Sequence, residues 1–265
     1  MSIAAKINVL LLLLIALLSG LIWVLQQPKA THPLLPNLKP AQIERIVVLP
    51  PDNPELRLHK QSGRWVLATL DDFPANAGVI EHLVALTQAE ILSEYPLPAA
   101  LAAFGLDRGV GIKFNDQMVK LGKLDPVKKQ RYVQIRDRLY LIFDRYSHHL
   151  KASLVSNRVV PDQGSIQQIQ LPQRVLTLTE AGWQSKPTLP VKKIQNIVNL
   201  WSHAVTQKIV LLAQPPEHSN VVLKVNDRLI HYWFDAAQNT LTRLKPAIRY
   251  KLSEKLLDQL MPRPD

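Results

Sequence analysis

An eight-residue pattern occurs twice in this chain. Residues 112–119 read IKFNDQMV and residues 223–230 read LKVNDRLI, an offset of 111 positions. Apolar residues match apolar residues, and the pattern Lys-x-Asn-Asp is kept in both copies. Asn and Asp tolerate the positive φ angles that tight hairpin turns require. We therefore predict two matching β-hairpins, and any fold of this chain has to accommodate both.

The elements around the two hairpins recur in the same order. In each copy a glycine-containing turn precedes a strand that starts at a tryptophan, Trp65 in the first copy and Trp183 in the second. Apolar residues at helical spacing then predict helices over 75–93 and 190–206, each opened by a proline. The matched apolar helix positions, each 114 residues apart, are Ile80 and Ile194, Leu83 and Ile197, Val84 and Val198, Leu86 and Leu200, and Ile91 and Val205.

These matches predict an internal duplication of a strand–strand–helix–strand–strand unit. The alternative is an incidental match, since hairpins with Asn-Asp turns are common. Four elements in one order favour the duplication. We expect the first repeat, with a basic segment, at 43–172 and the second at 173–265. The predicted fold class is α+β, with an N-terminal transmembrane helix followed by two tandem repeats of antiparallel strands with one packed helix each.

The most hydrophobic segment runs from Ile7 to Leu25 and has no charged residue in 19 positions. As a helix it would rise about 29 Å, which matches a hydrocarbon core of ~30 Å. The alternative is a cleaved signal peptide, whose apolar region usually spans about 7–15 residues. We therefore predict an uncleaved signal-anchor, a transmembrane helix over 7–25. Ala16 and Gly20 form a small-xxx-small pair in it, which would either contact another transmembrane helix or face lipid.

The flanks of this segment predict its orientation. A short N-terminus with Lys6 before a long C-terminal domain favours residues 1–6 in the cytoplasm and the domain outside. The predicted location is the inner membrane, single-pass, with the C-terminal domain in the periplasm or otherwise outside the cytoplasm. The chain has no cysteine, which excludes disulfides, thiol nucleophiles and cysteine-based metal sites.

A proline-rich segment at 26–42 follows, with prolines at positions 28, 33, 36 and 40. Proline fixes φ and pushes the preceding residue toward extended conformations, which favours a semi-rigid stalk. A linker that lies against the domain is the alternative.

Several short motifs resemble those of a known family. They are Phe73-Pro74-Ala75, Phe104-Gly105-Leu106-Asp107, Leu121-Gly122, Tyr132-Val133 and Leu139-Tyr140. In this order they resemble the bacterial domain-of-unknown-function 4340 family, from about residue 40 to residue 260. The resemblance implies a membrane-anchored, duplicated α+β domain. Some members are encoded with, or fused to, components of ABC-type export systems related to gliding motility.

The chain departs from that family at two places. Arg108-Gly109 stands where a proline is usual, and the basic motif near residue 157 is reduced to Asn157-Arg158. The shared motifs are typical of folding signals, so the resemblance provides no catalytic residues.

The sequence contains no motif for catalysis. The eight histidines include one adjacent pair, His148-His149, and none has the H-x-x-x-H spacing of a helical zinc site. The nucleophile elbow, the Walker loop and the G-x-G-x-x-G pattern are also missing. We therefore expect no enzymatic activity, no cofactor and no metal site. An uncharacterised hydrolase is the less favoured alternative.

The segment between residues 120 and 158 is strongly basic, with ten Lys/Arg against three Asp. Such a surplus attracts anionic lipid headgroups, an anionic polymer or an acidic partner. The alternative is a solvated basic face. The candidate residues for binding an anionic surface are Lys120, Lys123, Lys128, Lys129, Arg131, Arg136 and Arg138.

These features together favour a non-enzymatic accessory or interaction protein of the cell envelope, associated with an inner-membrane transport or assembly complex. The expected partners are the inner membrane and a membrane or periplasmic protein, for which an ABC-type transporter component is one candidate. The second hypothesis is a binding protein for an anionic envelope ligand or lipid surface through residues 120–158. Nucleic acid is not expected as a partner in the predicted compartment.

Overall fold

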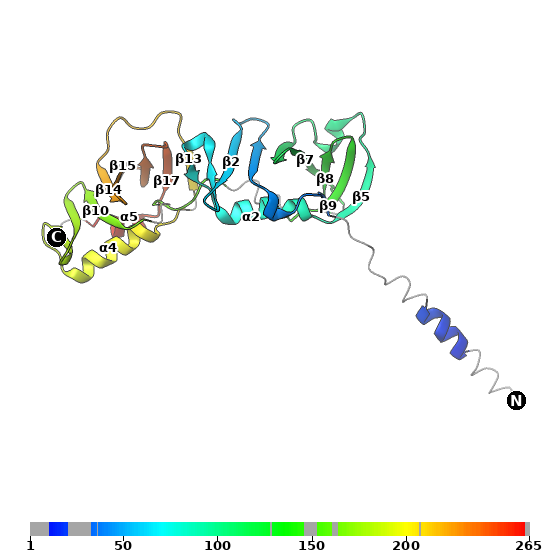
Figure 1. Cartoon of the computed structure of the whole chain (residues 1–265), viewed down its shortest axis with the longest axis horizontal. Coiled ribbons are helices and arrows are strands. Elements are labelled where there is room, and N and C mark those ends of the chain that lie inside the picture. The colour runs from blue at the N-terminus through cyan, green and yellow to red at the C-terminus, as the bar shows by residue number, and fades with distance from the viewer. Residues whose placement is uncertain are drawn as a thin grey trace.

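Two large antiparallel sheets lie side by side along the long axis of the molecule (Figure 1). The computed structural model describes residues 11–20, 33–35, 37–127, 129–145, 153–160, 164–206 and 208–262. We call the nine-stranded sheet with its helices the first unit, and the eight-stranded sheet with its helices the second unit.

In the view of Figure 1, the described α-helix of the first unit lies below its sheet. Its elements are η1 (Pro40–Gln42), β1 (Arg45–Leu49), β2 (Leu56–Gln61), β3 (Arg64–Leu67), η2 (Ala68–Leu70), β4 (Phe73–Pro74), α2 (Ala77–Ala85), η3 (Leu86–Gln88), β5 (Ile91–Pro96), η4 (Leu101–Phe104), β6 (Val110–Phe114), β7 (Gln117–Leu124), β8 (Gln130–Ile135) and β9 (Arg138–Phe143).

The second unit carries two α-helices. Its elements are β10 (Ile166–Leu171), β11 (Arg174–Thr179), β12 (Gly182–Lys186), α4 (Val191–His203), β13 (Lys208–Leu211), β14 (Val221–Val225), β15 (Arg228–Asp235), β16 (Thr240–Arg243), β17 (Ile248–Lys251) and α5 (Glu254–Leu260).

The strand order is the same in both sheets. The first runs β4-β3-β2-β1-β6-β7-β8-β9-β5, and the second runs β12-β11-β10-β14-β15-β16-β17-β13. In each unit three strands form a meander, a helix follows, and the next strand pairs at the far edge with the last strand. Only β4 lacks a counterpart. The second sheet starts with β10, which precedes the repeat boundary predicted at 172/173.

Both helices bury an apolar stripe against their sheet. In α2 the buried residues are Val79, Ile80 and Leu83, and the Asn76 side chain caps the first turn by accepting from the backbone N–H of Val79. In α4 the buried residues are Ile194, Ile197, Val198 and Trp201. A helix with apolar residues at this spacing gains its stability mainly from such packing.

The repeated Lys-x-Asn-Asp motif ties each hairpin to the start of a neighbouring strand. The Asn115 Oδ1 accepts from the backbone N–H groups of Glu44 and Arg45, at 3.0 and 3.1 Å, just before and at the start of β1. The Asn226 Oδ1 accepts from the Ser165 N–H at 3.0 Å, just before β10. Both asparagines have positive φ angles, 50° and 47°. The motif therefore has the same structural role in the two units.

The motifs of the family resemblance are packing contacts. Gly122 lies under the turn that ends η4, and a Cβ there would overlap the carbonyl oxygen of Phe104. Gly105 has a φ of +66°, and a Cβ there would lie 2.9 Å from the backbone nitrogen of Lys123. The completely buried Leu106 fills the space between the turn and β7. These glycines allow the turn to approach the strand closely.

The predicted fold class is wrong. An α+β class was expected, whereas the described residues form mostly antiparallel sheet, with nine strands in one sheet and eight in the other. Segments that looked helical or irregular form strands instead. The predicted helix 75–93 ends at Ala85, a short 3-10 turn follows, and Ile91 opens β5. Ile91 pairs with Ile142 of β9, so ladder hydrogen bonds replace the expected helical ones.

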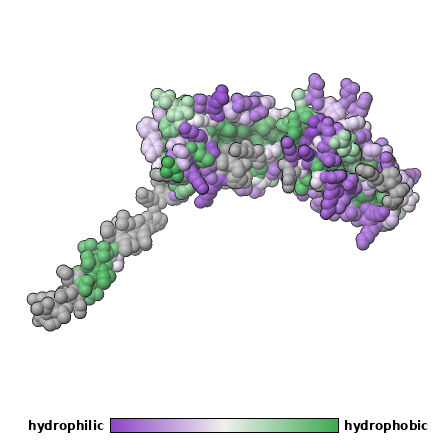
Figure 2. Space-filling model, turned by 180° about the vertical axis from the view of Figure 1, so that it is seen from behind, coloured by the Kyte–Doolittle hydropathy of each residue, from purple (hydrophilic) through white to green (hydrophobic). Residues whose placement is uncertain are grey.

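The transmembrane prediction is also wrong. Residues 11–20 are helical and exposed, and Figure 2 shows them as an apolar stretch that projects away from the sheets. Among the described residues, no helix combines the length and the apolar character needed to cross a bilayer. The rest of the predicted segment, 7–10 and 21–25, lies outside the described residues.

This finding contradicts three predictions: the signal-anchor helix over 7–25, the single-pass location in the inner membrane, and the assignment of a cytoplasmic N-terminus and a periplasmic domain. The proposed helix contact through Ala16 and Gly20 depended on the spanning helix. Both residues are exposed in the described helical segment 11–20, and a Cβ on Gly20 would meet no atom within 4 Å.

The described end of the proline-rich segment packs on the first unit. Leu34, Leu35 and Leu38 are buried in the hydrophobic core. The N–H groups of Leu34 and Leu35 donate to the carbonyls of Ala89 and Thr87, at 2.8 and 2.9 Å. From residue 33 onward, apart from residue 36, which lies outside the described residues, this segment therefore lies against the domain.

A short segment at 153–160 joins the two units and hydrogen-bonds to both. On the first unit, Asn76 N–H donates to the Leu154 carbonyl at 2.8 Å. On the second unit, Val159 N–H donates to the Ala204 carbonyl at 2.9 Å, and the Tyr232 hydroxyl donates to the Val159 carbonyl at 2.7 Å. Isolated bridges also pair Ala75 with Val155 and Arg158 with Val205.

Candidate functional site at the fork between two strands

The ladder between β7 and β8 covers only part of the two strands. Lys120 pairs with Gln134 and Leu121 with Val133, and after a register shift Leu124 pairs with Arg131. Residues 117–119 of β7 pair with β6 on the other side, and the β7–β8 ladder does not reach them. The two strands therefore part beyond Lys120, and we call this place the fork.

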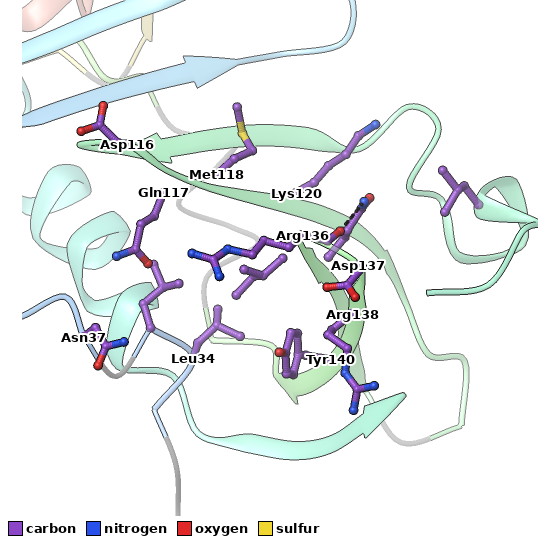
Figure 3. Close-up of a pocket in the computed structure, with 14 residues that line it drawn as sticks. Leu34, Asn37, Asp116, Gln117, Met118, Lys120, Arg136, Asp137, Arg138 and Tyr140 are labelled. Carbon is purple, nitrogen blue, oxygen red and sulfur yellow. Dashed lines mark hydrogen bonds between the residues drawn. The ribbon is translucent and has the colours of Figure 1, made fainter. Parts of the chain in front are cut away.

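A pocket of about 680 Å³ lies at the fork. This volume is within the range of about 300–1,000 Å³ that is typical of ligand pockets. Figure 3 shows β7 with Met118 and Lys120 on one side, and the β8–β9 hairpin with Arg136, Asp137 and Arg138 on the other. The pocket thus has walls from two strands that no longer pair.

The inner wall of the pocket is apolar. Leu34 and Leu35 reach it from the N-terminal segment, and Leu101, Ile135 and Tyr140 add further apolar surface. The pKa of the Tyr140 hydroxyl is raised, first by burial and then by the nearby Glu94 carboxylate. The hydroxyl therefore stays protonated at neutral pH and can donate a hydrogen bond into the pocket.

Three cations surround the mouth of the pocket. The Arg138 Nε donates to the Glu94 carboxylate at 2.7 Å, and this bond raises the pKa of the guanidinium. Lys120 and Arg136 also line the pocket, and within the described parts of the chain neither forms an ion pair. Asp137 at the hairpin tip is the one acid beside them without an ion pair there. Arg138 is thus neutralised, whereas Lys120 and Arg136 are available to an anion.

Asp116 also lines the pocket, but its charge is shared with two cations on neighbouring strands. Its carboxylate lies 3.8 Å from the Arg45 guanidinium and 4.0 Å from the Lys113 ammonium. The acid is therefore compensated outside the pocket.

The structure brings together three of the seven predicted basic residues, Lys120, Arg136 and Arg138. Lys123 and Lys129 are exposed and do not line this pocket. Lys128 lies outside the described residues. The predicted basic segment is thus not one continuous surface.

Arg131 has a structural environment that the sequence did not reveal. It lies in β8, and its Nε and Nη2 donate to the two carboxylate oxygens of Asp144, at 3.1 and 3.2 Å. Its Nη1 donates to the Gly122 carbonyl. The two side chains are only 13% and 5% exposed. A bidentate pair with this little exposure is committed to the fold and not to a ligand.

The sequence analysis identified the cations of this site but not its apolar wall. The apolar wall includes Leu34 and Leu35, which were placed in a stalk, and Tyr140, which was treated as a family motif residue. The run Leu34-Leu35 after a proline was a usable signal, because exposed linkers seldom carry adjacent leucines. Nothing in the sequence indicated where the β7–β8 ladder stops.

The potential metal ligands are scattered over the residues that the structure describes. No group of three or more His, Asp or Glu side chains there is placed to hold a metal ion. The pair His148-His149 lies outside the described residues. His82 and His203 occupy corresponding helices, and each Nδ1–H donates to the carbonyl four residues earlier, at 2.6 and 2.9 Å.

Comparisons of the chain with family models, curated proteins and solved structures gave no match. The resemblance to the domain-of-unknown-function 4340 family therefore stays a prediction.

Proposed function

We propose that this protein is a non-enzymatic binding module that holds an acidic, extended segment of a protein partner at the fork between β7 and β8. The observation that carries the proposal is the convergence of Lys120 and Arg136 on one pocket, where neither forms an ion pair with a described residue. The two cations come from strands that part at this point, so an anionic group between them interacts with both.

The apolar wall refines the class of partner. A pocket with cations at the mouth and leucines inside suits an anionic segment that also carries an apolar side chain. A bare anion would make no use of the apolar wall that Leu101, Ile135 and Tyr140 extend into the pocket. The part of β7 beyond the ladder adds an unpaired strand edge, which favours an extended peptide that pairs by main-chain hydrogen bonds.

Binding of fluorescent poly-L-glutamate, measured by anisotropy at low and physiological salt, tests this proposal. The double variant Lys120→Glu/Arg136→Glu should weaken binding about tenfold or more, because two attractive charges become repulsive. The matched control is Lys192→Glu/Lys255→Glu, which reverses two exposed lysines of the second unit. It makes the same change in net charge and should have little effect.

Equal losses from both double variants would mean that only net charge matters, and the proposal would be wrong. The absence of binding at low salt would also reject it. Polyphosphate serves as a second probe, since stronger binding of polyphosphate than of poly-L-glutamate would indicate a polymer rather than a peptide.

A further inference from the structure

The second unit contains a buried arginine without a counter-ion. Arg174 is the first residue of β11 and is only 7% exposed. Its Nη1 donates to the Pro187 carbonyl at 3.1 Å and lies 3.5 Å from the Ser185 hydroxyl oxygen. The Nε is buried and has no hydrogen-bond partner. No carboxylate of the described residues forms an ion pair with this guanidinium.

A buried charge that lacks both a counter-ion and a full set of acceptors destabilises a fold. The fold itself does not require it. Counted from the tryptophan hairpin, the corresponding residue of the first unit is Leu56, the first residue of β2, because Lys60 pairs with Trp65 there as Leu178 pairs with Trp183 here. The same strand order is therefore compatible with leucine at this place.

Arg174 lines a cavity of about 380 Å³ that is separate from the fork. The β10–β11 turn, the end of β15 and α5 enclose the cavity, and Leu171, Phe234, Leu257 and Met261 form its apolar walls. A cavity of this size holds a small organic molecule. The buried guanidinium provides the polar group that such pockets use to orient a ligand.

Two carboxylates complete the lining. Glu254 and Asp258 lie one turn apart on α5 and are exposed. Neither forms an ion pair with Arg174. They leave the guanidinium without a counter-ion and its Nε without an acceptor, and they add negative charge at the mouth of the cavity.

From these observations we infer that the cavity beside Arg174 binds a small organic carboxylate with a branched apolar chain. The carboxylate accepts from the guanidinium, whose planar geometry matches two oxygen atoms. The apolar chain packs against Leu171, Phe234 and Leu257. Amino acids and simple carboxylic acids both carry the required carboxylate and apolar chain. In an amino acid, the amino group would face Glu254 and Asp258.

Titration of the full chain, followed by the NMR shifts of its backbone amides, tests this inference. The probes are 4-methylpentanoate, leucine and the uncharged 4-methylpentan-1-ol. Both carboxylates should give saturable shifts at residues around the cavity, and the alcohol should bind at least tenfold more weakly. Stronger binding of leucine than of 4-methylpentanoate would assign the site to amino acids, and the reverse order to simple carboxylic acids.

Two variants separate a ligand site from a purely structural role of Arg174. Arg174→Leu introduces the residue of the first unit, and it should reduce binding of the carboxylates at least tenfold with an unchanged or higher melting temperature. Ala236→Trp keeps the arginine and fills the cavity, in whose lining the exposed Ala236 lies, and it should also abolish binding. Arg228→Leu, the change of an exposed arginine on β15, is the control and should bind normally.

The inference fails if the native chain shows no saturable response to either carboxylate, or if the alcohol binds equally well. It also fails if Ala236→Trp retains binding, because the ligand would then lie elsewhere. An Arg174→Leu variant that does not fold would assign a structural role to the arginine, and the Ala236→Trp result then decides whether the cavity binds carboxylates.

Discussion

The two units place different chemistry at the same positions of the same sheet order. In the first unit Arg131 and Asp144 form a bidentate ion pair that is nearly buried. When the β8–β9 and β16–β17 ladders are matched, the pair Arg131–Ile142 corresponds to the pair Leu241–Tyr250. In the second unit Leu241 therefore stands in the place of Arg131. Leu252, two residues after Tyr250, stands in the place of Asp144, and both leucines are buried.

The difference teaches that the topology requires filled space at this point, not charge. The same holds at the fork, where the ladders place His231, Pro246 and Ile248 of the second unit at the positions of Lys120, Arg138 and Tyr140. The shared strand order does not explain the charged residues of the first unit, which is why we regard them as candidates for binding.

The largest expected change in the free energy of unfolding comes from the ion pair between Arg131 and Asp144, and it tests whether the two units are interchangeable at this point. Arg131→Leu leaves the buried Asp144 without its two guanidinium bonds and should lower the free energy of unfolding by about 3–5 kcal/mol. The double variant Arg131→Leu/Asp144→Leu copies the second unit and should lie within about 1 kcal/mol of the native protein. Urea unfolding followed by tryptophan fluorescence measures both. A double variant as unstable as the single one would show that the two units are not interchangeable here.

Gly122 provides the next largest effect. Its replacement by alanine forces β7 away from the turn that ends η4 and should cost about 2–3 kcal/mol. The second unit has Trp233 at the corresponding position, so the close approach is specific to the first unit. Gly78→Ala in α2 is the control, because a Cβ there meets only Asn76 at 3.8 Å. It should stabilise the helix by about 0.5–1 kcal/mol. Urea unfolding of both variants checks the contrast, and effects of the same sign would contradict it.

The two asparagines of the repeated motif should differ in a graded way. The Asn115 side chain makes three hydrogen bonds to the backbone before and at β1, whereas Asn226 makes one to the backbone before β10. Asn115→Ala should therefore cost about 2 kcal/mol and Asn226→Ala about 1 kcal/mol. The comparison needs both values from the same urea titration. Equal losses would mean that the positive φ, and not the side-chain bonds, determines the residue.

The smallest effect concerns the ion pair within the second hairpin. The Lys224 ammonium lies 2.9 Å from the Asp227 carboxylate and lowers the pKa of this acid, first through the hydrogen bond and then through its charge. A lowered pKa means that the pair stabilises the folded state above the ordinary Asp pKa of about 3.9, and that this contribution is lost as the pH falls through the folded-state pKa. An NMR titration of Lys224→Met should show the pKa rising back toward the ordinary value. An unchanged pKa would rule out the pair as its cause.

The repeated pattern in the sequence was sufficient to locate both Asn-Asp hairpins and the cores of both helices. It was insufficient where pairing decides the structure. The segment IQQIQL at residues 166–171 has too few apolar residues to stand out, yet it forms β10 because its backbone pairs with β11 and β14. Similarly, Arg131 was a candidate for binding an anionic surface, and only its place in β8 opposite Ile142 brings it to Asp144.

The candidate site was predicted in part for the same reason. Composition located Lys120, Arg136 and Arg138, because charge surplus is visible in a sequence. The pocket itself depends on where the β7–β8 ladder stops and on which distant segment covers it. Leu34 lies far from Tyr140 in the chain, and only tertiary packing brings both to one wall.

The segment at 153–160 has a consequence for the motion of the whole molecule. A connection between two sheets usually acts as a hinge, whose amides exchange with solvent through small local openings. Here the connection is fastened to the first unit at Leu154 and Ser156, and to the second at Asn157 and Val159. Swinging one sheet away from the other would break these bonds together. We therefore expect deuterium uptake at the Ser156 and Val159 amides to be as slow as in the adjoining sheets, so that the two sheets keep a fixed separation.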